Sequence, residues 1–234
     1  MEVDVMGKAM WDYWSGDHTQ DIITHSSLEE EDILPLSHLF RSHEEMPRLE
    51  QKALTLAHGR VLDVGCGAGG HSLYLQEKGL HVTALDNSTG AVAVCRARGL
   101  TQTVCSDFLL FSEGTYDTLL LLMNGVGIVG KLAHLDAYLL KMKSLLRPNG
   151  QILLDSSDII YMYPTDEDGG HWIPDTMDYY GEVTFTLTYK NFKSAPFHWL
   201  YLDFNTLQRA AWSHGLACEL VQEGDHFDFL ARIY

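Results

Sequence analysis

The chain has 234 residues, of which 46% are hydrophobic, and a formal net charge of −16. This length suits one large domain, or a domain with a small cap, and is sufficient to bury a full core. The acidic balance leaves no basic patch for a phosphate backbone or an anionic membrane, so we expect neither nucleic acid nor membrane as a partner. We expect a monomer or a homodimer.

Cysteine usage and the start of the chain bear on where the protein works. The four cysteines form no C-x-x-C pair, which is typical of reduced thiols that serve as small apolar residues. The first residues lack a basic region followed by an apolar stretch, and no run approaches the length of a membrane span. We therefore expect a cytoplasmic protein.

The first quarter of the chain differs in pattern from the remainder. Residues 1–58 lack a strand-like apolar run and predict a helical cap, in which Pro47 suits the first turn of a helix. From residue 60, strands and helices alternate. We expect strands at 61–64, 81–85, 103–105, 116–123 and 151–154, and helices after residue 70 and at 89–98 and 131–147.

The regular alternation stops at Ser156. Residues 158–201 are aromatic and acidic, and they predict an inserted β-hairpin with strands at 182–190 and 197–202. Asp203 is the expected N-cap of a last helix, and two strands near 216–222 and 226–234 form an antiparallel finish.

This pattern predicts a doubly wound α/β fold. We expect a mostly parallel seven-stranded sheet with an antiparallel final strand, an N-terminal helical cap and a β-hairpin inserted after strand five. The cap would be residues 1–58 and the main domain residues 59–234, with 158–201 as a lid, all within one structural domain.

Residues 61–71 read VLDVGCGAGGH, an apolar strand that runs into a glycine-rich turn and then a helix. Glycines allow a sharp turn and a close approach of a ligand, and the N–H groups of the following helix carry partial positive charge. Gly65, Gly67 and Gly70 satisfy G-x-G-x-x-G, and Asp86 lies at a suitable distance to hold a ribose. This turn alone permits a dinucleotide cofactor, but it equally fits a second kind of cofactor.

Three carboxylates at successive strand ends separate the two cofactors. Asp63 precedes the glycines, where it would repel a pyrophosphate but could support a cation. Asp86 ends the second strand and can accept from both ribose hydroxyls. Asp107 follows the third strand and can accept from an exocyclic amine, while Phe108 can pack on a purine. The set suits a ligand with a ribose, an adenine and a positive centre but no phosphate, which describes S-adenosylmethionine (SAM).

At these residues the chain resembles the class I, Rossmann-like SAM-dependent methyltransferases. The resemblance rests on residues 61–69, Asp86, the segment 106–108, Tyr116-Asp117 at the start of strand four and residues 147–150 before strand five. It covers about residues 58–157 well and the last thirty residues loosely. It implies SAM as the cofactor, bound by residues at the ends of the first four strands: Asp63, Gly65, Cys66, Gly67, Asp86, Asn87, Asp107, Phe108, Asn124 and Gly125.

Catalysis in this class needs mainly an in-line placement of the nucleophile against the methyl group. A base is needed only where the nucleophile must lose a proton, and Asp155 and His171 are candidates for it. Tyr13, Arg41 and Trp172 are candidates for the substrate pocket, because Arg41 can pair with a carboxylate and aromatic walls suit a small, partly apolar molecule. The histidines show no metal-ligand spacing, so we expect no bound metal.

The leading hypothesis is a SAM-dependent methyltransferase that acts on a small-molecule substrate by in-line displacement. Two alternatives stay open. One is an NAD(P)-dependent oxidoreductase, which G-x-G-x-x-G and Asp86 favour but Asp63 and Asp107 disfavour. The other is a SAM-binding sensor or partner subunit without methyl transfer.

Overall fold

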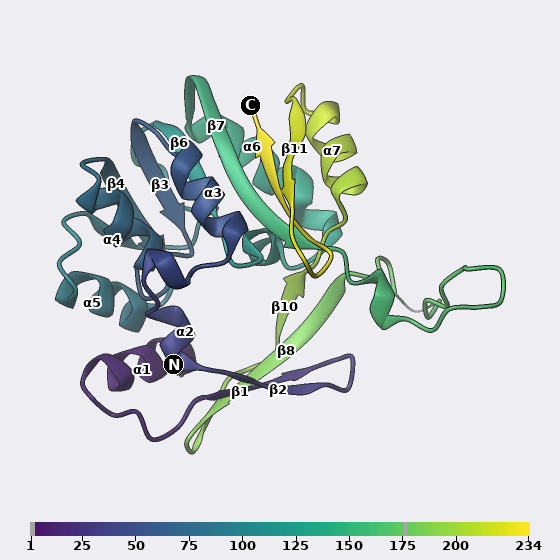
Figure 1. Cartoon of the computed structure of the whole chain (residues 1–234), viewed down its shortest axis with the longest axis horizontal. Helices are drawn as coiled ribbons and strands as arrows, with labels where there is room; N and C mark the ends of the chain where they lie inside the picture. The colour runs from purple at the N-terminus through teal and green to yellow at the C-terminus, as the bar shows by residue number, and fades with distance from the viewer. Residues whose placement is uncertain (1–2, 176) are drawn as a thin grey trace.

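The chain forms two β-sheets that lie one above the other, with helices packed around them (Figure 1). The computed structural model describes residues 3–175 and 177–234. One sheet has seven strands and comes from the middle and the end of the chain. The other has five strands and joins the N-terminal segment to the insertion.

The seven-stranded sheet has the strand order β11-β12-β7-β6-β3-β4-β5. Strands β3 to β7 are parallel, β12 is antiparallel to β7, and β11 is antiparallel to β12. The expected doubly wound fold with an antiparallel final strand is therefore confirmed. The strands are β3 (Arg60–Val64), β4 (His81–Asp86), β5 (Thr103–Cys105), β6 (Tyr116–Leu121), β7 (Leu146–Ser157), β11 (Cys218–Glu223) and β12 (Asp228–Ile233).

Helices cover both faces of this sheet because successive strand residues point to opposite sides. On β3, Val61 packs with α3 (Arg48–Leu56) and α4 (Gly70–Glu77), while Leu62 belongs to the cluster of α6 (Leu135–Leu145) and α7 (Phe204–Ser213). Helix α5 (Thr89–Ala97) lies on the α4 side, against Ala84. The carboxylate of Asp203 accepts the N–H of Thr206 at 2.9 Å, so the predicted N-cap of α7 is present.

The five-stranded sheet has the order β10-β8-β1-β2, with β9 paired to β8. Its strands are β1 (Ile22–Ser26), β2 (Glu31–Leu34), β8 (Glu182–Tyr189), β9 (Phe192–Lys193) and β10 (Phe197–Leu200). The inserted hairpin is present, and its strand β8 pairs along β1. We call this structure the lid sheet.

The N-terminal segment is only partly the helical cap that the sequence predicts. Besides α1 (Val5–Trp14), α2 (Leu36–Leu39) and α3, it contains the hairpin β1–β2. The expectation that residues 1–58 hold no strand is therefore wrong. The apolar run is only Ile22-Ile23, and this short strand is stable because it pairs with β8, far away in the sequence.

Helix α1 joins the lid sheet to the main domain. Its Val5 and Ala9 pack with Ile22 and Leu187 of the lid sheet, while Met10 packs against α5. Short 3₁₀ helices complete the fold: η1 (His43–Glu45), η2 (Gly125–Val129), η3 (Leu132–His134) and η4 (Ile160–Met162). None of the helices in the described part of the chain is both long and apolar enough to span a bilayer.

The docking of α1 depends on a close approach of two glycines, which a substitution can test. A Cβ on Gly90 would lie 2.5 Å from the backbone carbonyl carbon of Gly7. We expect Gly90→Ala to lower the free energy of unfolding by about 1–3 kcal/mol, because α1 must move away from α5. Urea unfolding measures this change. Thr89→Ala, at an exposed neighbour in the same helix, is the control, and an equal loss in both variants would contradict the close-packing account.

Candidate functional site

The glycine turn lies between the end of β3 and the start of α4. Gly65 and Gly67 have φ angles of 72° and 53°, in the left-handed region that favours glycine. A Cβ on Gly67 would meet nothing within 4 Å, and one on Gly65 would meet only a methyl of Ile128 at 3.9 Å. The turn therefore leaves open space beside its backbone, as a ligand cradle requires.

Two of the three predicted acids lie beside this space. The carboxylate of Asp86 accepts the N–H of Gly67 at 2.9 Å and the N–H of Ser88 at 2.9 Å, and burial raises its pKa. Asp107 is exposed and caps the following turn by accepting the N–H of Leu109 at 2.8 Å. Phe108 is buried beside it, with its ring 5.8 Å from that of Tyr138.

The third acid, Asp63, lies under the turn instead of in the open space. Its side chain is buried, accepts the hydroxyl of Ser72 at 2.6 Å and has a pKa raised by burial. Asp63 does not line the cavity that opens beside the turn. Asp63 therefore supports the turn from below, through Ser72 at the start of α4.

The loop after β6 has an unusual backbone that the end of β7 holds in place. Met123 and Asn124 both have positive φ, at 66° and 55°, which is costly for residues other than glycine. The carboxylate of Asp155 accepts the N–H of Met123 at 3.0 Å and the N–H of Gly125 at 2.8 Å. The Asn124 side chain accepts the N–H of Ser157 and donates to the carbonyl of Leu200.

Asp155, the first candidate base, is therefore committed to holding this loop. It is 8% exposed and does not line the cavity, and burial raises its pKa to about 6. The N–H groups of Met123 and Gly125 share this one carboxylate, and these two hydrogen bonds stabilise the positive-φ backbone at Met123 and Asn124. Asp155 therefore positions this loop.

A buried charged group connects the N-terminal segment to the glycine turn. The guanidinium of Arg41 donates to both carboxylate oxygens of Glu50, at 2.5 and 2.6 Å, and also to the carbonyl of His38. Nε2 of His71 lies 2.7 Å from the same Glu50 carboxylate. Burial alone lowers the pKa of His71, but the contacts with Glu50 and Asp63 outweigh it and raise this pKa above its usual value.

A cavity of about 1610 Å³ extends from the glycine turn to the lid sheet. Every predicted cofactor residue except Asp63 lines it, and so does Arg41. Phe197 and Trp199, two aromatic residues of the predicted insertion, line it too. The lid sheet and its surroundings add residues that the sequence did not single out, namely Thr24, Ser26, Asp32, Leu34, Val183, Phe185, Leu187, His198 and Tyr201. In the sequence, Val183, Phe185 and Leu187 alternate with polar residues along β8. This alternation could have predicted that the three side chains share one face of the strand.

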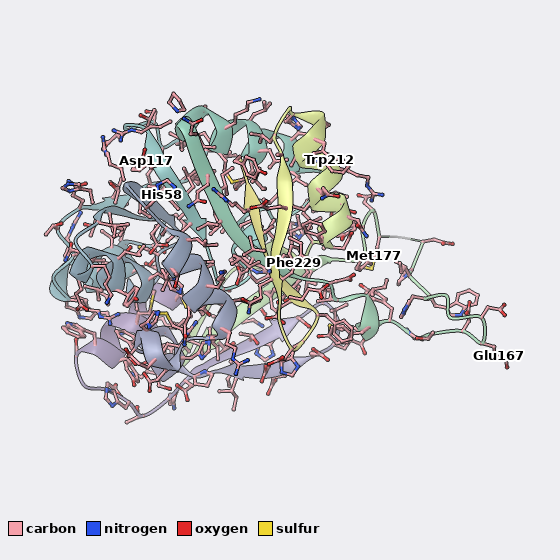
Figure 2. The ribbon with its side chains drawn as sticks, turned by 45° about the horizontal axis from the view of Figure 1, so that its top comes forward. His58, Asp117, Glu167, Met177, Trp212 and Phe229 are labelled. Carbon is pink, nitrogen blue, oxygen red and sulfur yellow. The ribbon has the colours of Figure 1, made fainter. Side chains whose placement is uncertain are left out.

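Three further candidates lie outside the cavity. Trp172 is 69% exposed, and Nδ1 of His171 lies 3.2 Å from the backbone carbonyl of Tyr163. Both belong to the loop that projects from the body of the protein, with Glu167 near its far end (Figure 2). Tyr13 stacks between His18 and Phe40 and does not line the cavity. These side chains are therefore poorly placed to contact a ligand at the glycine turn.

In residues 3–175 and 177–234, no group of three or more His, Cys, Asp or Glu side chains could hold a metal ion. The four cysteines are all free, and only Cys105 is exposed.

Comparisons with known proteins agree with this geometry. Residues 61–150 match a family model described as a methyltransferase domain. A crystal structure of a SAM-dependent methyltransferase from Bacteroides fragilis, in complex with S-adenosyl-L-homocysteine (SAH), is 43% identical, with a TM-score of 0.91. The match covers 99% of this chain and 94% of that chain. The chain therefore belongs to the SAM-dependent methyltransferases, and its cofactor is SAM, as the strand-end acids predict.

Curated relatives match over shorter stretches. The ubiquinone biosynthesis O-methyltransferase of Xanthomonas euvesicatoria is 33% identical over 114 residues, which are 44% of this chain and 45% of the relative. The protein of the same name from Xylella fastidiosa is 42% identical over 57 residues, 24% of this chain and 23% of the relative. The chain thus spans less than half the length of these relatives.

The role of Asp155 gives a pH-dependent prediction. Its pKa of about 6 means that the carboxylate accepts both loop amides above this pH and becomes a protonated, weaker acceptor below it. We expect the amide NMR signals of Met123 and Gly125 to titrate together with a midpoint near pH 6, and this titration to be absent in Asp155→Asn. Signals that stay constant between pH 5 and 7 in the unsubstituted protein would contradict this role.

Proposed function

We propose that this protein transfers the methyl group of SAM to a small-molecule acceptor that binds between the glycine turn and the lid sheet. The observation that carries the proposal is the continuous cavity between the predicted cofactor residues and the lid. Its volume of about 1610 Å³ exceeds the roughly 300–1,000 Å³ of a pocket for one drug-sized ligand. The cavity thus has room for the cofactor and a second molecule.

The adenosine end of SAM fits the residues beside β4 and β5. Asp86 would accept from the ribose hydroxyls, with Asn87 beside it, and each carboxylate oxygen retains a second lone pair for this purpose. Asp107 would accept from the adenine amine, and Phe108 would pack on the purine. Gly65, Cys66 and Gly67 would line the ribose and methionine parts, in the space where a Cβ on Gly67 meets nothing.

The amino-acid end of SAM fits Arg41 and His71 better than it fits Asp63. Arg41 and His71 both line the cavity, whereas Asp63 does not. Nε of Arg41 is buried without a hydrogen-bond partner among the described residues, which is unusual for so polar a group. A carboxylate of the cofactor would satisfy it. Asp63 would act only indirectly, because its carboxylate helps to raise the pKa of His71. Arg41 would then serve the cofactor, where the sequence suggested a substrate carboxylate.

The part played by the protein in the transfer is positioning. SAM supplies a sulfonium whose methyl group already has a good leaving group. Asn124 and Gly125, held by Asp155 and Ser157, would flank this methyl group, and the lid sheet would exclude water from the acceptor. Fixed alignment of two bound reactants is worth several orders of magnitude in rate without any base.

The acceptor atom of the curated relatives is not carried over to this protein. The name O-methyltransferase describes an oxygen acceptor for those proteins, but the shared stretch is under half of either chain. The nicotinamide alternative has no residue in this cavity that favours a pyrophosphate over SAM. A protein that only binds SAM would form no SAH and no methylated product when it is incubated with SAM and acceptors, which distinguishes this role from methyl transfer.

The cofactor assignment has a direct test. Isothermal titration calorimetry with SAH and, separately, with NADH should show binding of SAH only, because the amino-acid end of SAH fits Arg41 and the carboxylate of Asp63 disfavours a pyrophosphate beside the glycine turn. Asp86→Ala should weaken SAH binding about tenfold or more, since it removes the ribose acceptor. Asp168→Ala, on the projecting loop, is the matched control. Binding of NADH with no binding of SAH would overturn the proposal.

The role of Arg41 can be tested with two ligands that differ only at the amino-acid end. We expect Arg41→Lys, which retains a positive charge next to Glu50, to weaken SAH binding about tenfold or more. Binding of 5′-methylthioadenosine, which lacks the amino acid, should be unchanged, and it serves as the control for correct folding. An equal loss for both ligands would mean that Arg41 supports the fold and not the carboxylate.

A further inference from the structure

We propose that the acceptor is an amine carried on an aromatic or apolar ring, and that the lid sheet selects it through an aromatic wall and a rim of carboxylates. This inference rests on the proposed methyl transfer and adds the chemical class of the acceptor. The register of the lid sheet brings aromatic, hydroxyl and carboxylate side chains together along the cavity that the cofactor residues also line.

The aromatic wall comes from β8, β10 and the residue after β10. Phe185 and Phe197 are directly paired in the antiparallel register, with ring centroids 6.1 Å apart. Trp199 meets Phe197 edge-on at 6.3 Å, and Tyr201 lies 6.5 Å from Phe185. All four of these rings line the cavity. They offer a ring-shaped apolar ligand a contiguous surface, and their faces attract a cation.

Trp199 fixes this wall against the loop that would flank the methyl group. Its indole lies so close to Gly127 in η2 that a Cβ on this glycine would overlap the ring. The same stretch of chain is tied to the loop a second time, since the carbonyl of Leu200 accepts from the Asn124 amide at 3.2 Å. A molecule stacked on the wall is therefore held beside Asn124 and Gly125, next to the expected position of the methyl group.

The charges around the cavity favour a cation over an anion. No lysine lines the cavity within the described ranges. Arg41 and His71 do line it, but both are paired with Glu50 and would serve the carboxylate of the cofactor. Five carboxylates line it, of which Asp86 and Asp107 would serve the cofactor and Asp4 caps α1, so that Glu30 and Asp32 beside the lid sheet remain for the acceptor. An anionic acceptor would have to move out of water into a cavity that offers it no free cationic partner among the described residues, which is costly. An ammonium group would find carboxylates and aromatic faces instead.

Asp32 lines the same cavity as the aromatic wall but lies two strands away from β8 in the lid sheet. Asp32 on β2 is paired with Thr24 on β1, and Thr24 is paired with Leu187 on β8. In the neighbouring row, Ser26 is paired with Phe185. The lid surface thus changes from aromatic at β8 and β10 to hydroxyl and carboxylate at β1 and β2. A ring that bears an amine matches this change.

The chemistry of the transfer is compatible with this class. The ammonium group that the lid binds first loses a proton to water, and the lone pair of the resulting free amine forms the new nitrogen–carbon bond. The carbon–sulfur bond breaks with its electron pair passing to sulfur, which leaves a neutral thioether. The nitrogen then carries the positive charge and loses a proton to water if it bears one. No base in the cavity is required once the free amine has formed.

Three probes of one shape test the class of the acceptor. They are 2-phenylethylamine, 2-phenylethanol and 3-phenylpropanoate, which share a ring and differ in charge. Binding is measured by calorimetry on the full chain saturated with SAH, so that only the remaining space is available. We expect the amine to bind about tenfold tighter than the carboxylate, with the alcohol in between.

Variants assign the preference to the lid. Phe185→Leu should weaken binding of the amine several-fold, and Trp172→Ala, an exposed aromatic residue outside the cavity, should leave it unchanged. Asp32→Asn should reduce the advantage of the amine over the alcohol, whereas Asp168→Asn should not. Loss of SAH binding in any variant would mark a folding defect, and the other variants then carry the test.

Two outcomes overturn the inference. One is a carboxylate probe that binds as tightly as the amine, and the other is an amine that does not bind at about 10 mM, which is weaker than any useful acceptor. Methylation of the amine, detected as the N-methyl product by mass spectrometry with SAM in place of SAH, would support it. Failure of the unsubstituted protein to bind SAH would count against the proposed function itself, which separates the two claims.

Discussion

The pairing of β1 with β8 is the constraint on which the rest of this structure depends. It joins residues 23–26 to residues 185–188, in antiparallel register, and turns two separate hairpins into one sheet. Either hairpin alone would be marginal in water. Together they bury Ile22, Leu187 and Tyr189 against α1, which also packs on α5. The lid sheet is thereby fixed over the carboxyl ends of the parallel strands.

This arrangement separates two tasks in space. The parallel sheet supplies the glycine turn, Asp86 and Asp107, each at the end of a strand, where ligands bind in open α/β folds. The lid sheet supplies the aromatic and polar surface that faces them across the cavity. The loop of Met123 and Asn124 lies where the two meet, and it is held from β7 by Asp155 and from the lid by Leu200. A small shift of either sheet would therefore alter the alignment of two reactants.

The sequence predicts well whatever is encoded locally. The glycine turn, the strand-end acids and the cap at Asp203 are short patterns whose structural meaning depends on few distant residues. The hairpin β1–β2 escaped prediction because its stability comes from β8, about 160 residues further along the chain. The roles of Asp63, Asp155 and Arg41 escaped for the same reason. Ser72, the Met123 loop and Glu50 determine what these charged groups do, and no local pattern reveals those partners.

A crystal structure of the protein with SAH and 2-phenylethylamine bound together would test directly whether the acceptor lies between the cofactor and the lid sheet. We expect the ribose on Asp86, the adenine against Phe108, and the amine nitrogen facing the sulfur with its ring on Phe185 and Trp199. A structure in which the sulfur faces away from the lid sheet, or in which the amine lies outside the cavity, would contradict this expectation.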